Sequence, residues 1–336
     1  MKLRLSHRVF DLPLAHAFTI SRYTVNIQKT VIVQITDGDV TGYGEATANP
    51  YYDSTVQKMA ASIARVAPVV EQSELIHPSE LWQKIEPPLR DDYFALCAID
   101  VAYWDFYARK HQKPLRAFFS ASNEAPITSY TIGLASIEQM RRKILEMPWP
   151  LYKIKLGTRH DLEIVKSLRE ITDSIFRVDA NAAWTAEQTI RMSHELAALD
   201  VEFIEQPLPH ACLLEMKKVR SESALALIAD ESCQGQEDVS RCRDFHGINI
   251  KLMKCGGITP ALKMIDQARA LGLKVMAGCM TESSVGISAL CQLAPMLDFL
   301  DADGALLLAK DIARGVTFHG GKIEWANGYG TGVYLH

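Results

Sequence analysis

Five ionisable side chains recur through the middle of the chain at nearly constant intervals. They are Lys155, Asp179, Glu205, Asp230 and Lys254, with steps of 24, 26, 25 and 24 residues. Such a step is about the length of one strand–loop–helix–loop unit, and each residue stands near the end of an apolar, strand-like stretch. In a parallel barrel, the ends of consecutive strands face one central mouth. The spacing therefore predicts three carboxylates and two amines around one small volume.

Strand and helix patterns alternate from residue 121 to residue 314. Helical patterns include 162–172, 186–199, 211–221 and 259–271. Strand patterns stand between the helices, at 127–133, 152–156, 175–180, 202–206, 225–230, 248–254, 274–279 and 298–303. This order predicts an α/β fold in which eight units form a (β/α)8-type barrel that serves as the catalytic domain.

Residues 1–120 follow a different order, with strands first and helices afterwards. Strand patterns at 30–36 and 40–45 flank the turn Asp37-Gly38, and helical patterns follow near 54–72, 78–87 and 93–111. This order predicts an N-terminal α+β capping domain. The turn-rich tail, 315–336, is expected to return to this domain and complete it.

Composition excludes several classes of partner. The 336 residues are 48% hydrophobic and 23% charged with a net charge of −4, which gives no basic surface for nucleic acid or anionic lipid. No apolar run approaches the roughly 20 residues of a membrane span, and the first residues lack the apolar core of a signal peptide. Seven scattered cysteines without a CxxC pair are typical of reduced thiols. We expect a cytoplasmic enzyme with a small-molecule substrate and leave open whether it forms a homo-oligomer.

The three carboxylates form the predicted metal site. Asp179, Glu205 and Asp230 each follow an apolar strand and precede a polar turn. Any one of them could instead be a solvated turn residue or a helix cap. Three in consecutive units would repel one another without a cation, and oxygen ligands without His or Cys favour Mg²⁺ over zinc.

Two lysines share one face of the second barrel strand. Lys153 and Lys155 are two residues apart, and the interior is their expected side because Tyr152, Ile154 and Leu156 form the apolar, helix-packed face. We expect the pKa of both lysines to fall below the free value of about 10.4, because each amine lies near the other and near a metal.

Lys254 is expected at the end of the sixth strand, across the ring from Lys155. A carbon atom held between the two amines could lose a proton on one face and regain it on the other. The alternative is that each lysine merely points into solvent from a strand end.

These motifs resemble the enolase superfamily, in its muconate-lactonising subgroup. The resemblance runs nearly end to end and includes the segments 42–46, 98–105 and 249–257, the Lys-x-Lys pair and the three carboxylate motifs. It implies Asp179, Glu205 and Asp230 as Mg²⁺ ligands and Lys155 and Lys254 as the acid/base pair. The seventh strand pattern carries no histidine, which argues against the branch that uses a His–Asp dyad.

The last strand pattern indicates the substrate. Asp301 and Asp303 resemble the pair with which dipeptide epimerases bind the N-terminal ammonium group of a dipeptide. The resemblance then implies inversion of the α-carbon of the C-terminal residue through an ene-diolate, with Lys153 helping to hold its charge. Thr131 and Cys279 resemble substrate-contacting positions, although both could be wall packing. The Asp pair could also merely cap a loop.

Two segments of the first domain, 18–24 and 49–53, are expected to fold over the barrel mouth. Arg22 could pair with the γ-carboxylate of a glutamyl residue, which would suit L-Ala-D/L-Glu from murein peptides, or it could be a surface arginine. The rival enzymes are an N-acylamino-acid racemase, an o-succinylbenzoate synthase or a cycloisomerase. An inactive ligand-binding barrel is the alternative that is not an enzyme.

Overall fold

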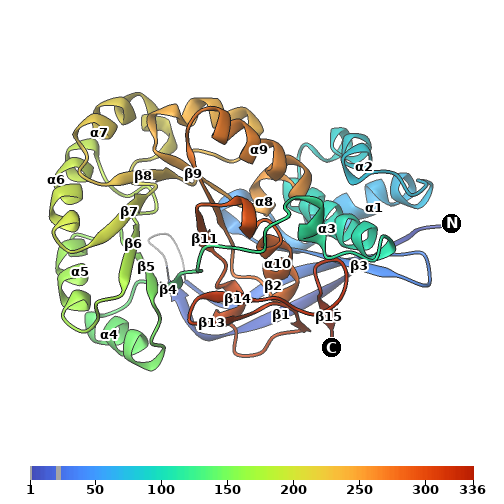
Figure 1. Ribbon diagram of the computed structural model, residues 1–336, viewed down its shortest axis with the longest axis horizontal. Helices are drawn as coiled ribbons and strands as arrows, with labels where there is room; N and C mark the ends of the chain where they lie inside the picture. Colours follow the sequence, from blue (N-terminus) through green and yellow to red (C-terminus); the bar gives the residue numbers. More distant parts are fainter. Residues whose placement is uncertain (1, 20–23) are drawn as a thin grey trace.

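The computed structural model describes residues 2–19 and 24–336. An antiparallel sheet with three helices lies beside a ring of parallel strands that is wrapped by helices (Figure 1). Every helix within the described part of the chain is too short or too polar to cross a bilayer.

The N-terminal unit, termed the cap, contains three antiparallel strands in the order β1-β2-β3. The strands are β1 (Arg4–Thr19), β2 (Thr24–Thr36) and β3 (Thr41–Thr47), and the helices are α1 (Val56–Glu71), α2 (Pro78–Ile85) and α3 (Tyr93–Lys110). Strand β1 was missed in the sequence because it lies at the sheet edge and most of its residues are polar or exposed.

Helix α3 packs directly on β3 because two glycines remove the side chains between them. A Cβ atom on Gly42 would lie 2.3 Å from the carbonyl oxygen of Ala102, and one on Gly44 would lie 2.1 Å from that of Ala98. The helix is thereby buried on almost every side, which explains why its sequence is apolar rather than amphipathic.

Eight parallel strands form the barrel in sequential order, from β4 to β11. They are β4 (Tyr130–Ile132), β5 (Leu151–Lys155), β6 (Ile175–Asp179), β7 (Val201–Glu205), β8 (Ala226–Ala229), β9 (Gly247–Ile250), β10 (Lys274–Gly278) and β11 (Phe299–Asp301). A parallel bridge between Thr128 and Leu300 brings the first and last strands together. The barrel expected from the sequence is therefore confirmed.

Helices cover the outside of the ring (Figure 1). The α-helices are α4 (Ile137–Glu146), α5 (Asp161–Arg169), α6 (Ala186–Ala197), α7 (Met216–Glu222), α8 (Leu252–Cys255), α9 (Ile258–Ala270) and α10 (Ser284–Cys291). Short 3-10 helices occur at η1 (Pro50–Tyr52), η2 (Pro87–Leu89), η3 (Leu115–Phe118), η4 (His210–Glu215), η5 (Gln236–Asp244), η6 (Ala294–Met296) and η7 (Gly304–Leu307).

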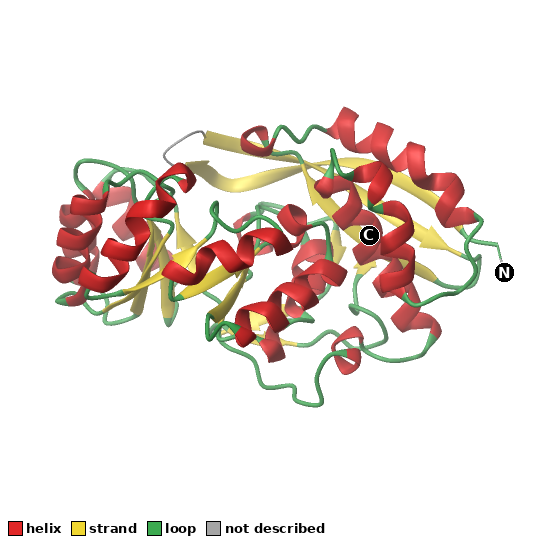
Figure 2. Cartoon of the chain, turned by 90° about the horizontal axis from the view of Figure 1, so that it is seen from above, coloured by secondary structure: helices red, strands yellow, loops and turns green. Residues whose placement is uncertain are grey.

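The cap extends over the end of the barrel where its strands finish (Figure 2). The tip of β1 is tied there by hydrogen bonds from Leu134 N to the Thr19 carbonyl at 2.9 Å and from Ala309 N to the Pro13 carbonyl at 2.8 Å. A cavity at the carboxyl ends of the strands therefore has a roof from the cap.

The C-terminal tail runs back along α3. It contains the short strands β13 (Thr317–His319), β14 (Lys322–Glu324) and β15 (Tyr334–Leu335), and β12 (Ala313–Arg314) directly precedes it. Leu115 N donates to the Gly330 carbonyl at 2.7 Å, and the Arg109 guanidinium donates to the Val333 carbonyl at 2.6 Å.

Candidate active site

A cavity lies between the barrel mouth and the cap. Barrel side chains form its floor, and Phe18, Val25, Tyr51 and Tyr52 of the cap form its roof. Both roof segments expected from the sequence therefore contribute to the cavity wall. Arg22 lies outside the described residues.

Three buried carboxylates converge beside the cavity. Asp179 ends β6, Glu205 ends β7 and Asp230 follows β8, so strand ends bring all three to the same side of the ring. One oxygen from each lies within 4.8 Å of the others. The convergence predicted from the spacing is thus present, and an all-oxygen donor set of this size fits a divalent cation such as Mg²⁺.

The electrostatics of the triad point the same way. Burial raises the pKa of Glu205 to about 7, although the nearby Lys153 opposes the shift, and the charges of Asp179 and Asp230 raise this pKa further. The pKa of Asp179 and that of Asp230 are instead lowered by neighbouring lysines, so Glu205 is the member of the triad whose ionised form a divalent cation would favour most.

Lys153 lines the cavity, and its ammonium group also lies among three carboxylates. Its ammonium group is 2.8 Å from Glu205, 2.7 Å from Asp301 and 3.4 Å from Asp179. Burial alone would lower the pKa of Lys153, but Asp301, Glu205 and Asp179 together raise it well above its usual range. The expected lowering was wrong for this residue, because its nearest neighbours are carboxylates and not other amines.

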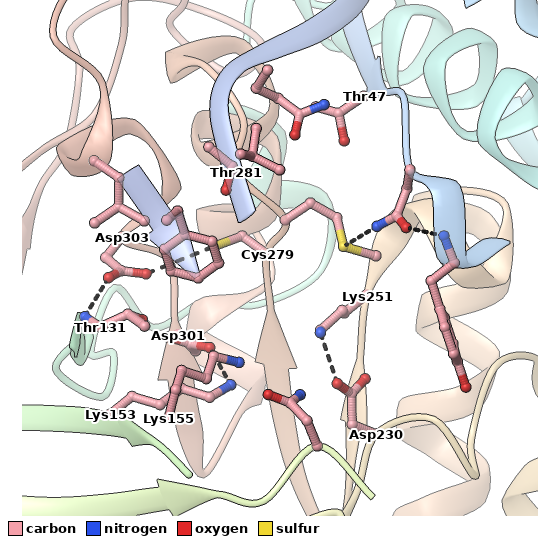
Figure 3. Close-up of a pocket in the computed structure, with 18 of the residues that line it drawn as sticks. Thr47, Thr131, Lys153, Lys155, Asp230, Lys251, Cys279, Thr281, Asp301 and Asp303 are labelled. Carbon is pink, nitrogen blue, oxygen red and sulfur yellow. Dashed lines mark hydrogen bonds and ion pairs between the residues drawn. The ribbon is translucent and has the colours of Figure 1, made fainter. Parts of the chain in front are cut away.

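Lys155 and Lys251 stand on opposite sides of the cavity (Figure 3). Lys155 ends β5 and its Nζ lies 2.6 Å from Asp179, whereas Lys251 follows β9 and its Nζ lies 2.7 Å from Asp230. Three strands separate β5 from β9 in either direction around the ring. The two amines can therefore reach opposite faces of a molecule held between them.

The predicted placement of Lys254 at a strand end was wrong. Strand β9 stops at Ile250, four residues earlier than expected, and Lys254 belongs to α8. Its Nζ is buried and donates to Asp230 Oδ1 at 2.6 Å and to the carbonyls of Asp230 and Cys233 at 2.6 and 2.9 Å. Lys254 is not among the described residues that line the cavity.

Lys251 is the site residue that the sequence reasoning missed. The regular spacing of about 24 residues favoured Lys254, but strand periodicity would have found Lys251. Asn249 faces the interior and donates to Glu205 at 2.9 Å, and Lys251, two residues later, continues the same face.

Asp301 and Asp303 both line the cavity but have different partners. The two oxygens of Asp301 accept from Ser129 Oγ at 2.6 Å and from Lys153 Nζ at 2.7 Å. One oxygen of Asp303 accepts from the backbone N–H of Thr131 at 2.6 Å, and the other is 3.9 Å from Cys279 Sγ (Figure 3). Of the two predicted carboxylates, Asp303 thus has more capacity left for a ligand.

Burial and the neighbouring Asp301 raise the pKa of Asp303 to about 7. A cation placed beside it would favour its ionised form. Thr131 and Cys279 also line this end of the cavity, as expected, and burial together with Asp303 and Asp301 keeps the pKa of the Cys279 thiol well above its usual range.

Family comparison agrees with this geometry. Residues 5–119 match the family described as mandelate racemase/muconate lactonizing enzyme, N-terminal domain, and residues 135–336 match the one described as enolase C-terminal domain-like. The resemblance that the motifs indicated is thereby confirmed.

Individual proteins are similar along the whole chain. The L-Ala-D/L-amino acid epimerase of Flavobacterium johnsoniae is 50% identical, with 99% of this chain and 100% of that protein covered. The L-Ala-D/L-Glu epimerase of Bacteroides thetaiotaomicron is 36% identical, with 99% and 88% covered.

Solved structures share the architecture. A substrate-liganded L-Ala-D/L-Glu epimerase from Bacillus subtilis has a TM-score of 0.94 at 28% identity, with 99% of each chain covered. A dipeptide epimerase from Enterococcus faecalis, complexed with Mg and L-Leu-L-Tyr, has a TM-score of 0.94 at 29% identity, with 100% of each chain covered. Domain matches and full-length relatives together establish that this chain belongs to the mandelate racemase/muconate lactonizing enzyme family of the enolase superfamily.

Proposed function

We propose that this protein is a Mg²⁺-dependent dipeptide epimerase that inverts the α-carbon of the C-terminal residue. The observation that carries the proposal is the pair Lys155 and Lys251, which approach one cavity from opposite sides next to a carboxylate triad. Relatives of 50% and 36% identity that are named epimerases of L-Ala dipeptides support the same assignment.

The charges along the cavity support one orientation of the bound dipeptide. Asp179, Glu205 and Asp230 would hold Mg²⁺, which when bound supplies positive charge beside the substrate carboxylate and stabilises the negative charge that develops there. Asp303, toward β11 and β4, would accept the N-terminal ammonium group in a charge-assisted hydrogen bond.

The two lysines then act on opposite faces of the substrate α-carbon. One of Lys155 and Lys251 removes the α-proton as the neutral amine, which leaves an ene-diolate on the substrate, and the other returns a proton to the opposite face as the ammonium ion. Lys153, held by three carboxylates, adds a fixed positive charge beside the triad. Lys254 has no direct part in proton transfer and instead positions Asp230.

The substrate we propose is an L-Ala dipeptide, with L-Ala-D/L-Glu as the first candidate. The names of the relatives support L-alanine as the first residue. An enzyme of this kind would serve the recycling of murein peptides in the cytoplasm, and the seven free cysteines are consistent with a reducing compartment.

The test is incubation of L-Ala-L-Glu in D₂O with Mg²⁺, followed by chiral separation and mass spectrometry. We expect L-Ala-D-Glu carrying one deuterium at the glutamyl α-carbon. A panel of other L-Ala dipeptides tests whether the enzyme acts on a second residue other than glutamate. Failure of every dipeptide to gain deuterium would overturn the proposal, and racemisation of N-succinylated amino acids instead would favour an N-acylamino-acid racemase.

A further inference from the structure

A buried carboxylate of the cap holds the beginning of a barrel helix. Glu45, in β3, is 1% exposed and lies at the N-terminus of α10. It accepts from Ser283 N at 3.0 and 3.1 Å, from Ser283 Oγ at 2.5 Å and from Gly286 N at 2.9 Å. The Thr30 hydroxyl adds a bond at 2.8 Å from within the cap.

A second buried carboxyl group meets Glu45 at this junction. A Cβ atom on Gly286 would lie 1.9 Å from Glu282 Oε2 and 3.3 Å from Glu45 Oε2, so both groups converge on the same glycine. Burial and the charge of Glu45 raise the pKa of Glu282 to about 8. Burial raises the pKa of Glu45 as well, although the hydrogen bonds from Ser283, Gly286 and Thr30 favour its ionised form and oppose that rise.

The segment that leads into α10 forms the ammonium end of the cavity. Cys279, Met280 and Thr281 line the wall, immediately before the residues that Glu45 holds. This segment packs closely on the residue after Asp303, because a Cβ atom on Gly304 would lie 2.4 Å from the Met280 carbonyl oxygen and 3.1 Å from Glu282 N.

We infer that Glu45 is a positioning residue that fixes the β10–α10 segment, and through it Asp303, for recognition of the substrate ammonium group. The inference rests on the proposed function. Glu45 is not among the described residues that line the cavity, and its oxygens accept hydrogen bonds from Thr30, Ser283 and Gly286. The ionised form of Glu45 is complementary to the partial positive charge of the α10 N-terminus.

A second buried acid of the cap, Asp100, also contacts the barrel but is not expected to affect recognition of the ammonium group. Asp100 of α3 is 2% exposed and accepts from Thr259 N at 2.9 Å and Thr259 Oγ1 at 2.7 Å, at the start of α9. It performs the same kind of capping but on a helix that does not lead to the ammonium end. Asp100→Asn is therefore a matched control for Glu45→Gln.

The experiment compares native enzyme, Glu45→Gln and Asp100→Asn in steady-state epimerisation of L-Ala-L-Glu. N-acetyl-L-Ala-L-Glu, which lacks the ammonium group, is used as a competitive inhibitor. For Glu45→Gln we expect KM to rise about ten-fold with kcat within about two-fold, as for the loss of one charge-assisted contact, and the Ki of the acetylated compound to stay unchanged. For Asp100→Asn we expect both KM and Ki to stay unchanged, even if the thermal midpoint of this variant is lower than that of the native enzyme.

A KM for Glu45→Gln within two-fold of native, or equal rises in KM and Ki, would overturn the inference. If Glu45→Gln does not fold, Ser283→Ala removes the 2.5 Å contact from the other side and must give the same KM-specific change. Failure of the proposed function is distinct, because it would appear as no epimerisation by the native enzyme.

Discussion

At the scale of single residues, the cavity balances carboxylates against lysines in a fixed pattern. Asp179 has Lys155, Asp230 has both Lys251 and Lys254, and Asp301 has Lys153. Glu205, which shares Lys153 with Asp301, and Asp303, which forms no ion pair with a lysine among the described residues, are the two whose pKa rises to about 7. These two positions are where the proposed Mg²⁺ and substrate ammonium group would add the missing positive charge.

Glu282 gives a residue-scale prediction on pH dependence. Its pKa is about 8 in the folded protein, because of burial and Glu45, against an ordinary value of 4.5. Between these pH values the folded protein keeps a proton that the unfolded chain has lost, so Glu282 lowers stability progressively as pH rises, by at most about 1.4 kcal/mol per pH unit. Glu282→Gln removes this penalty.

The measurement is the thermal midpoint of Glu282→Gln minus that of the native protein, from pH 5 to pH 8. We expect this difference to become more positive as pH rises. A difference that stays constant across this range would contradict the assigned shift.

At the scale of elements, the packing of α3 on β3 depends on Gly44. A methyl group there meets the Ala98 carbonyl oxygen at 2.1 Å, and the backbone of a buried helix cannot move aside. We expect Gly44→Ala to lower the free energy of unfolding by about 3 kcal/mol in urea titrations. Gly320→Ala is the control, because its Cβ meets nothing within 4 Å and only the positive φ of 54° is strained, at about 1 kcal/mol. Equal losses for the two variants would contradict close packing at Gly44.

Elements with a complete local pattern could be predicted from the sequence. Helices α5, α6 and α9 begin within one residue of their predicted starts, because their apolar periodicity is strong. The end of β9 could not be read in the same way, since the apolar residues of α8 continue the strand pattern without a break. That continuity, together with the regular spacing, led to Lys254 in place of Lys251.

At the scale of the whole molecule, the site exists only where the cap meets the barrel. The barrel, the acidic triad and the strand carrying Lys153 and Lys155 followed from period and spacing. The contacts of Asp301 with Ser129 and Lys153, of Asp303 with Thr131 and of Glu45 with α10 could not be predicted, because they join residues 148 to 241 positions apart.

Metal binding provides the prediction at this scale. Mg²⁺ held by the triad of the folded protein alone should stabilise the whole chain, by about 2.7 kcal/mol at a concentration 100 times its Kd. We expect Mg²⁺ to raise the thermal midpoint of protein stripped with EDTA, and Glu205→Gln to abolish the rise. Identical midpoints with and without Mg²⁺ in the native protein would contradict a metal site at the triad.

The most direct test of the account is exchange at the substrate α-carbon by three lysine variants. L-Ala-L-Glu and L-Ala-D-Glu are incubated separately in D₂O and Mg²⁺ with Lys155→Ala, Lys251→Ala or Lys254→Ala. The account predicts that the first two each lose epimerisation by about 10³-fold or more, while each still exchanges the α-proton of one epimer, a different one for each variant. Exchange of the same epimer by both variants would contradict it, and so would a loss of exchange with one epimer in Lys254→Ala but not in Lys251→Ala.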